Sequence, residues 1–193
     1  MLEAQHESAL AHLVDPTDTY ISIREIPTRG MIDLRGQTTD RKFMSLAKNL
    51  LGVDLPKLPR TSQSFGDVKA LWLSPDQWLI LCAHSIAAAL QAELSNTLKD
   101  NHALAVDVSD MRSIIRLEGE GAREVLMKGG SLDFTDGEFA PGYVRRMRFA
   151  EIAALVHVVE TNVVDLYVFR STAHYAFDFL KKAARNGSKT GVK

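Results

Sequence analysis

Two short polar segments contain the side chains with the clearest potential for chemistry. In the first, which runs from Asp107 to Arg112, two carboxylates and a guanidinium lie close together in the sequence. Paired carboxylates are suited to acid–base catalysis. Aspartates between two strands also accept hydrogen bonds from the backbone N–H groups of a turn, where they would pair with Arg112. We interpret this segment as such a turn.

The second segment, Arg145-Arg146-Met147-Arg148, is the densest positive run in the chain. Side chains alternate between the two faces of a strand, so Arg146 and Arg148 are expected on one face and Arg145 on the other. Such a row is able to bind an anion or an acidic partner protein. A solvated strand face is the simpler interpretation, and both remain open at this stage.

Both tryptophans of the chain, Trp72 and Trp78, lie in the segment Ala70–Leu81. This segment predicts a hairpin, because Pro75 favours a type I turn between two apolar strands. The indoles either pack in the core or anchor a partner protein, since tryptophan is enriched at interface hot spots. The candidate partner-interface residues are therefore Trp72, Trp78, Arg145, Arg146 and Arg148.

Motifs for other chemistry are absent from the sequence. The six histidines lack the close spacing of metal ligands. His157 lies in an apolar strand, where we expect a satisfied core or edge residue. Glycine motifs that bind phosphate, a nucleophile elbow and a catalytic cysteine context are missing as well. We therefore predict no catalytic, cofactor-binding or metal site on this chain.

Composition narrows the class of protein. A net charge of −1 over 193 residues gives no electrostatic reason to bind nucleic acid or an anionic membrane. The single cysteine, Cys82, excludes a disulfide framework. The sequence has neither an apolar run of about 18 residues nor a signal-peptide pattern, so we expect a cytoplasmic protein.

Hydrophobic periodicity predicts the secondary structure of the first part of the chain. Alternation indicates strands at Tyr20–Ile26 and Met31–Arg35. A helical stripe from Phe43 to Leu51 follows, with Thr38 or Thr39 as the N-cap and Gly52 at the end. After the hairpin, Ser85 is expected to cap a second helix with the stripe Ile86, Leu90, Leu94 and Leu98.

The same order of elements recurs from His102 onward. Adding 83 to positions of the first part pairs Ile23 with Val106, Arg29 with Arg112 and Gly36 with Gly119. The second part ends in three strands, near Tyr143–Phe149, Ile152–Val158 and Val163–Phe169, where the first shows two. A final helix, capped by Ser171 or Thr172, carries the stripe Ala173, Ala176, Phe177 and Leu180.

These elements predict an α+β fold built from duplicated strand-strand-helix-hairpin-helix halves. The connections between strands are too short for parallel crossovers, so we expect two antiparallel sheets with helices packed on one face. An N-terminal arm (1–19) precedes the first half (20–100) and the second half (101–185), which fuse into one compact unit. Residues 186–193 are expected to form a disordered tail.

Several segments together resemble the gamma subunit family of heterotetrameric sarcosine oxidase. The resemblance rests on Ile23–Pro27, Met31–Gly36, the tryptophan hairpin, Asp107–Gly119 and Leu155–Ala173. It implies a fold like that of the folate-binding aminomethyltransferases. It also implies a non-catalytic structural subunit in a complex with alpha, beta and delta partner subunits.

In that family, the complex oxidatively demethylates sarcosine to glycine and transfers the one-carbon unit to tetrahydrofolate. The resemblance implies that flavins, NAD and folate bind to the partner subunits and none to this chain. The glycine-rich segment with paired aspartates that aminomethyltransferases use is missing here, because Arg148–Ala153 lacks it. Two alternatives remain: a subunit of a related N-methyl amino acid dehydrogenase complex, or a stand-alone folate-binding protein in which Arg145, Arg146 or Arg148 holds the glutamate tail.

Overall fold

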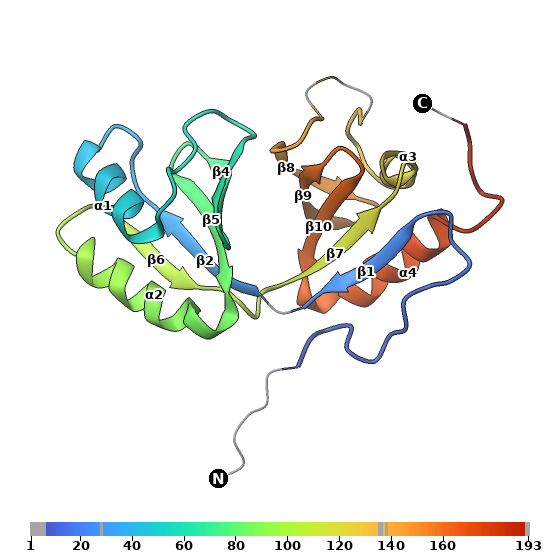
Figure 1. Ribbon diagram of the computed structural model, residues 1–193, viewed down its shortest axis with the longest axis horizontal. Helices are drawn as coiled ribbons and strands as arrows, with labels where there is room; N and C mark the ends of the chain where they lie inside the picture. Colours follow the sequence, from blue (N-terminus) through green and yellow to red (C-terminus); the bar gives the residue numbers. More distant parts are fainter. Residues whose placement is uncertain (1–6, 28, 135–136, 138, 192–193) are drawn as a thin grey trace, which may run out of the picture.

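The computed structural model has four layers, with two sheets facing each other and helices covering their outer sides (Figure 1). It describes residues 7–27, 29–134, 137 and 139–191. Both sheets have five strands, and every strand pair is antiparallel. The predicted α+β class with antiparallel sheets is therefore confirmed.

The first sheet has the strand order β3-β4-β5-β2-β6 and the second has β8-β9-β10-β7-β1. Strands of the first sheet are β3 (Ser62–Phe65), β4 (Val68–Ser74), β5 (Gln77–Ala83), β2 (Arg29–Arg35) and β6 (Leu104–Asp107). Those of the second are β8 (Val144–Phe149), β9 (Ile152–Glu160), β10 (Val163–Phe169), β7 (Arg112–Glu118) and β1 (Ser22–Ile26). Helices α1 (Arg41–Leu51) and α2 (His84–Thr97) cover the first sheet, and α3 (Ala122–Met127) and α4 (Ala173–Ala183), preceded by a 3₁₀ turn (Arg170–Thr172), cover the second.

The duplication is visible in the positions of the elements. Adding 83 to the bounds of β2 gives 112–118, which are the bounds of β7. Adding 86 to the bounds of β5 gives 163–169, which are the bounds of β10. Strand β3, which the sequence analysis missed, supplies the third strand of the first half and removes the apparent difference between the halves.

Each half gives its first strand to the other sheet. Strand β1 pairs with β7 in the second sheet, and β6 pairs with β2 in the first. Arg24 of β1 lies opposite Arg116 of β7, and Val106 of β6 lies opposite Asp33 of β2. Asp33 and Arg116 correspond to each other through the offset of 83. Arg24 therefore corresponds to Val106, and the first strands are related by an offset of 106 − 24 = 82. The predicted pairing of Ile23 with Val106 is therefore wrong by one residue, which is enough to place the two side chains on opposite faces.

Three apolar clusters hold the layers together. Two lie between a sheet and its helices, and Phe43, Trp78 and Leu94 belong to the one under α1 and α2. The third lies between the two sheets and includes Leu81 and Tyr167. The stripe of α4 is buried as predicted, with Phe177 only 3% exposed.

The helix starts differ from the predicted ones. Helix α1 is capped by Asp40, whose carboxylate accepts hydrogen bonds from the N–H groups of Lys42 and Phe43, and not by Thr38 or Thr39. Helix α2 begins after Ala83 without a side-chain cap, so the prediction of Ser85 is wrong.

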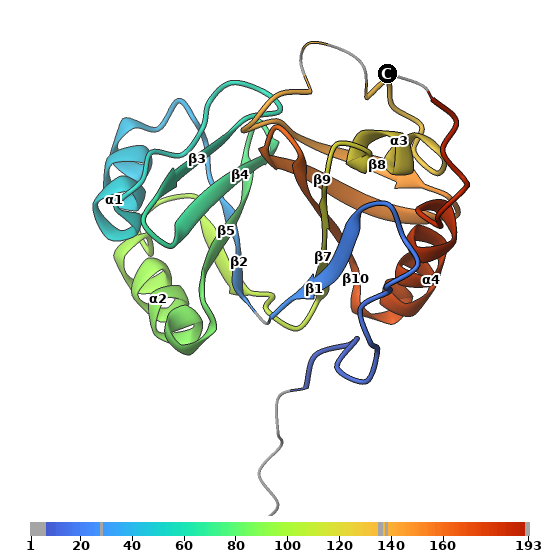
Figure 2. The same cartoon turned by 45° about the vertical axis from the view of Figure 1, so that its right-hand side comes forward.

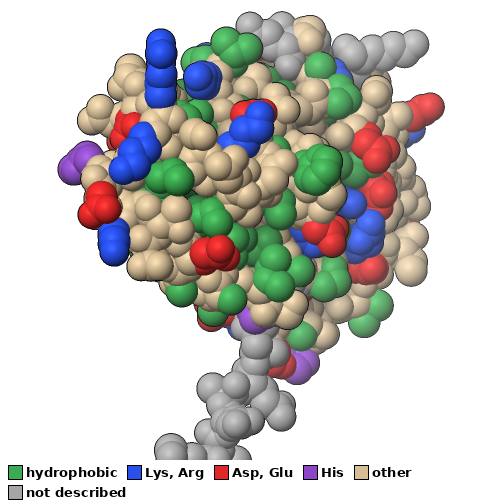
Figure 3. Space-filling model, turned by 60° about the vertical axis from the view of Figure 1, so that its left-hand side comes forward, with side chains coloured by type: hydrophobic (Ala, Val, Ile, Leu, Met, Phe, Trp, Pro, Cys, Tyr) green, Lys and Arg blue, Asp and Glu red, His purple; other side chains and the backbone are tan. Residues whose placement is uncertain are grey.

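The outer surface over α1 and α2 is only partly polar. Ile86, which begins the predicted α2 stripe, is 46% exposed. Figure 3 shows hydrophobic side chains between charged ones on this side of the molecule.

The described parts of the two chain ends contact the second half of the chain. Within residues 7–18 the chain forms turns without a helix or strand, and the Arg170 guanidinium donates a hydrogen bond to the carbonyl of Glu7. Within 186–191, the N–H of Thr190 donates to the Glu124 carboxylate at 2.8 Å. No helix in the described part of the chain is long and apolar enough to cross a membrane.

The strand exchange predicts that neither half is stable alone. Fragment 1–100 lacks β6, and its β1 has no β7 to pair with, so Ile23, only 1% exposed in the whole chain, loses its cover. We expect fragments 1–100 and 101–193 each to unfold without a cooperative transition, as followed by circular dichroism. Co-expression of the two fragments is the control, and it should restore cooperative unfolding. Either fragment unfolding alone with the midpoint of the full chain would contradict the exchange.

Candidate functional site

A buried region with several polar side chains lies between the two sheets. Figure 2 shows the sheets as two sides of a ring, with β2 and β5 facing β7 and β10. Apolar side chains fill the middle of this space, among them Met31, Leu79 and Leu155. Charged side chains lie beside this cluster on the same inner faces, where strand alternation places them.

A cavity of about 230 Å³ lies at one side of the inter-sheet cluster, and we call it the inter-sheet pocket. Both sheets line it: Arg29 and Lys69 come from the first, and Arg116, Asp165 and Tyr167 from the second. The exchanged strand β1 contributes Ile26. The pocket therefore depends on the way in which the two halves are joined.

A bidentate ion pair lies in the wall of the inter-sheet pocket. Arg116 Nε and one Nη donate to the two carboxylate oxygens of Asp165 at 2.7 and 2.9 Å. The two residues are direct neighbours across β7 and β10, and the Asp165 side chain is 5% exposed. Planar guanidinium and carboxylate groups match in this geometry, so the charge of Asp165 is compensated where water has little access.

His157 lies on the other side of Asp165, on β9. Its Nε2 is 3.2 Å from the Ser62 hydroxyl of the first sheet, so it joins the two sheets. Its Nδ1 is buried without a hydrogen-bond partner in the described part of the chain. Burial lowers the pKa of His157 to about 4, and the imidazole is therefore neutral near pH 7. The predicted burial of His157 is confirmed, whereas the expectation that its ring is satisfied holds for Nε2 only.

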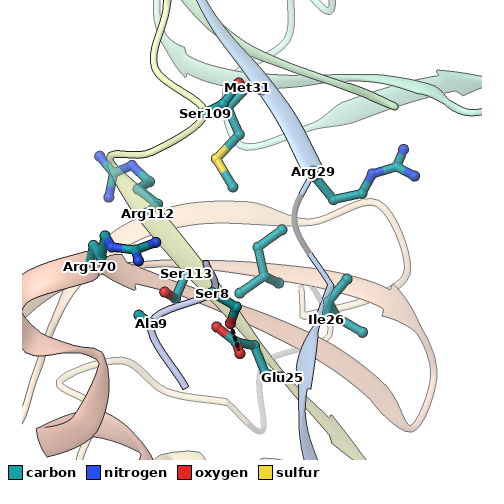
Figure 4. Close-up of a pocket in the computed structure, with 11 residues that line it drawn as sticks. Ser8, Ala9, Glu25, Ile26, Arg29, Met31, Ser109, Arg112, Ser113 and Arg170 are labelled. Atoms are coloured by element: carbon teal, nitrogen blue, oxygen red, sulfur yellow. Dashed lines mark hydrogen bonds between the residues drawn. The ribbon is translucent and has the colours of Figure 1, made fainter. Parts of the chain in front are cut away.

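The turn predicted at Asp107–Arg112 is present, at the point where the two exchanged strands leave their sheets (Figure 4). The Asp107 carboxylate accepts a hydrogen bond from the N–H of Ser109 at 2.9 Å. Ser109 Oγ accepts one from the N–H of Met31 at 3.0 Å, which fixes the turn to β2. Arg112 extends to the side, where its guanidinium lies 4.7 Å from the centre of the Phe169 ring.

Trp78 is a core residue. Its side chain is 0% exposed, its ring lies 5.8 Å from that of Phe43, and its Nε1 donates to the carbonyl of Pro56 at 2.8 Å. A side chain without exposed surface cannot contact a partner, so Trp78 is withdrawn as an interface candidate. Trp72 is half-buried against the same core, and its Nε1 has no hydrogen-bond partner among the described residues.

The three candidate arginines lie on β8, an edge strand of the second sheet. Arg146 donates to the carbonyl of Leu73 at 2.8 Å and so links the two sheets. Arg148 pairs with Glu151, and its side chain is 66% exposed. Arg145 lies within 3.3 Å of the Tyr143 hydroxyl. None of the three lines the inter-sheet pocket.

The inter-sheet pocket was not predicted from the sequence. A signal was present, because Asp165 interrupts the apolar run of β10 and Arg116 that of β7. A charged residue in a strand that is otherwise buried usually has a partner nearby. Identifying that partner requires the pairing of β7 with β10, which single-sequence periodicity does not provide.

The family of the chain follows from comparison with known proteins. Residues 35–186 match the model of the family described as "Sarcosine oxidase, gamma subunit family". The chain belongs to the sarcosine oxidase gamma subunit family. A curated relative, sarcosine oxidase subunit gamma from Corynebacterium sp. (strain P-1), is 28% identical over 171 residues, which cover 85% of this chain and 82% of the relative.

Two solved structures contain a fold similar to that of this chain. A chain of heterotetrameric sarcosine oxidase from Corynebacterium sp. U-96, in complex with pyrrole 2-carboxylate, superposes with a TM-score of 0.85 at 23% identity, covering 97% of this chain and 99% of that one. Glycine cleavage system aminomethyltransferase T from Bartonella henselae gives 0.62 at 14% identity, covering 82% of this chain and 44% of that one. The predicted aminomethyltransferase-like fold is confirmed.

Acid should destabilise this gamma subunit family member through His157. Because the pKa of His157 is lowered from 6.5 to about 4, folding favours the neutral ring. Above pH 6.5 the ring is neutral in both the folded and the unfolded chain. Between pH 6.5 and about 4 the unfolded chain binds a proton that the folded chain does not, so the free energy of unfolding falls by up to about 1.4 kcal/mol per pH unit. We expect His157→Gln to flatten urea-unfolding profiles over this interval. The exposed His174→Gln is the control, and an equal effect of both variants would refute the assignment.

The buried ion pair predicts a second effect on stability. Asp165→Asn leaves Arg116 without its counter-charge, and we expect a loss of about 3 kcal/mol in the free energy of unfolding. Glu118→Gln is the matched control, because Glu118 forms a pair with Arg24 in which both side chains are more than one-third exposed. That change should cost less than about 1 kcal/mol. The free energies of unfolding are measured by chemical denaturation. Equal losses in Asp165→Asn and Glu118→Gln would show that the inter-sheet environment does not strengthen the Arg116–Asp165 pair.

Proposed function

We propose that this chain is a structural, non-catalytic subunit of a heterotetrameric sarcosine oxidase. The complex would remove the methyl group of sarcosine oxidatively to give glycine and transfer the one-carbon unit to tetrahydrofolate. The observation that carries the proposal is the end-to-end match to a chain of such a heterotetramer, at 97% coverage of this chain and 99% of the other. A likeness over the full length of both chains is the pattern expected of equivalent subunits.

The arrangement of polar groups supports a structural role. Asp165 is engaged by Arg116, His157 is neutral and in contact with Ser62, and Asp107 accepts a hydrogen bond from a turn. These groups connect strands and sheets to each other. Among the described residues, no three or more His, Cys, Asp or Glu side chains are grouped to hold a metal ion.

The proposal assigns the remaining chemistry to the alpha, beta and delta subunits. Flavins, NAD and folate would bind there and not on this chain. The sequence supports this division, because it lacks the glycine motifs that hold dinucleotide phosphates. It also lacks the glycine-rich segment with paired aspartates that the resemblance to aminomethyltransferases would require. We place the complex in the cytoplasm.

The proposed partner contact includes the outer edge of β8. Arg148 is exposed there, and Arg145 and Arg146 are neighbours along the strand. Trp72 remains a candidate, since part of its surface is open. Exposed arginines at the rim of an interface attract an acidic partner and affect the association rate more than the final affinity.

Purification of the tagged chain from its native host tests the subunit role. We expect three further chains and a flavin absorption band to co-purify. The double variant Arg145→Glu and Arg148→Glu should slow assembly about tenfold or more, because both contacts with an acidic partner become repulsive. Arg41→Glu, at the exposed start of α1, is the matched control and should assemble normally. A colourless monomer from the native host would overturn the proposal.

A further inference from the structure

Lys69 is a half-buried cation without a directly paired counter-charge in the described part of the chain. It lies on β4 and lines the inter-sheet pocket. Its ammonium group forms no hydrogen bond or ion pair with any residue in the described ranges, although the side chain is half-buried. Burying a charge is unfavourable unless it is paired. The N–H groups of the Lys69 ammonium are therefore available to a ligand in a pocket to which water has limited access.

The charges around Lys69 only partly balance. Burial lowers the pKa of Lys69, and Arg116 and Arg29 lower it further, while Asp165 and Asp67 act in the opposite direction. Counting these five side chains as charged gives +3 and −2, a net charge of +1. Arg116 directs two of its nitrogens at Asp165, and Arg29 donates to the carbonyl of Asp67 at 2.7 Å. Asp165 is therefore already engaged, and Lys69 and Arg29 share the excess positive charge.

Tyr167 supplies a second donor to the same pocket. It lines the pocket from the opposite sheet, and it is only 1% exposed. Within the described part of the chain, its hydroxyl makes no hydrogen bond. Burial raises the pKa of Tyr167 well above its ordinary value, so the hydroxyl keeps its proton and remains a donor.

The pocket has a size and an entrance that suit a small solute. Its volume of about 230 Å³ is below the range of roughly 300–1,000 Å³ that is usual for drug-sized ligands. A molecule as long as a folate therefore exceeds it, whereas an anion of a few heavy atoms fits. Gly66 and Asp67, in the turn between β3 and β4, line the pocket and are exposed, so a solute reaches it from that side.

From these observations we propose that the inter-sheet pocket binds a small oxyanion. Lys69 Nζ and the Tyr167 hydroxyl would donate to its oxygens, with the Arg29 and Arg116 guanidinium groups nearby. The shared chemistry is a compact group of negatively charged oxygen acceptors, either a carboxylate or a phosphate. All the lining residues of the site belong to this chain, so anion binding does not depend on the proposed subunit role.

Titration of the purified full chain tests the proposal. Sodium acetate and inorganic phosphate are added separately at constant ionic strength, which is maintained with sodium chloride because screening alone changes stability. We expect saturable 1:1 binding in calorimetry and a rise in melting temperature with at least one anion. Tighter binding of acetate assigns the site to carboxylates, and tighter binding of phosphate assigns it to phosphoryl groups.

Variants connect the binding to the pocket. Lys69→Met retains the volume and removes the charge, so it should raise the melting temperature without anion and abolish the rise caused by anion. Tyr167→Phe should weaken binding severalfold and leave the fold intact. Lys57→Met, at an exposed lysine, is the matched control and should bind like the unaltered chain.

Two results would overturn the proposal. One is the absence of saturable heat with both anions up to tens of millimolar. The other is an anion-dependent rise in melting temperature that is as large in Lys69→Met as in Lys57→Met. Both readouts are obtained on the isolated chain, so their failure would leave the proposed subunit role unaffected, and purification of a colourless monomer would leave the anion site unaffected.

Discussion

The crossing of two connections between the sheets is the constraint on which the rest of this molecule depends. β2 follows β1 and β7 follows β6, and in each case the chain passes from one sheet to the other. Two hydrogen bonds fix the crossing: the N–H of Met31 donates to Ser109 Oγ at 3.0 Å, and the N–H of Val108 donates to the carbonyl of Met31 at 2.8 Å. The two sheets are thereby held face to face, and their inner surfaces become an interior.

That interior explains why charged residues occur on strands that are otherwise apolar. Two facing sheets need an apolar centre, which Leu81, Ile114 and Tyr167 help to provide. At its side, Arg116 and Asp165 neutralise each other within one sheet, while His157 and Arg146 reach across to the other. Polar links of this kind add little net stability in comparison with apolar packing, but they favour one relative position of the two sheets. The space between the two sheets is therefore partly polar, and its polar groups connect strands and sheets.

The sequence was sufficient for features that depend on local periodicity. The α1 stripe, the tryptophan hairpin, the repeat of elements and the family resemblance were all readable from residue types and spacing. Asp40 caps α1 in place of the expected Thr38 or Thr39, because the path of the backbone decides which side chain reaches the first N–H groups of the helix. Trp78 was left open between core and interface, because period 2 gives two faces without saying which face helices cover.

Features that depend on pairing between distant strands were beyond reach. The single-residue difference between the offsets of 82 and 83 arises at the connection before β7, where one extra residue is accommodated. Arg116 and Asp165 meet because β7 pairs with β10, and Lys69 lies near them because β4 belongs to the facing sheet. No local pattern encodes either contact. The sequence showed the charges, and the topology decided which of them became neighbours.

The exchange of first strands also determines the order in which the molecule can be completed during synthesis. Ser22 pairs with Glu118, 96 positions later, so β1 has no sheet to join until most of the chain has left the ribosome. The first sheet likewise waits for β6 before its edge is covered. Contacts of such long sequence separation slow folding and extend the time for which strand edges are exposed. The nascent chain is therefore most vulnerable to aggregation while its first half is finished and its second half is still being made.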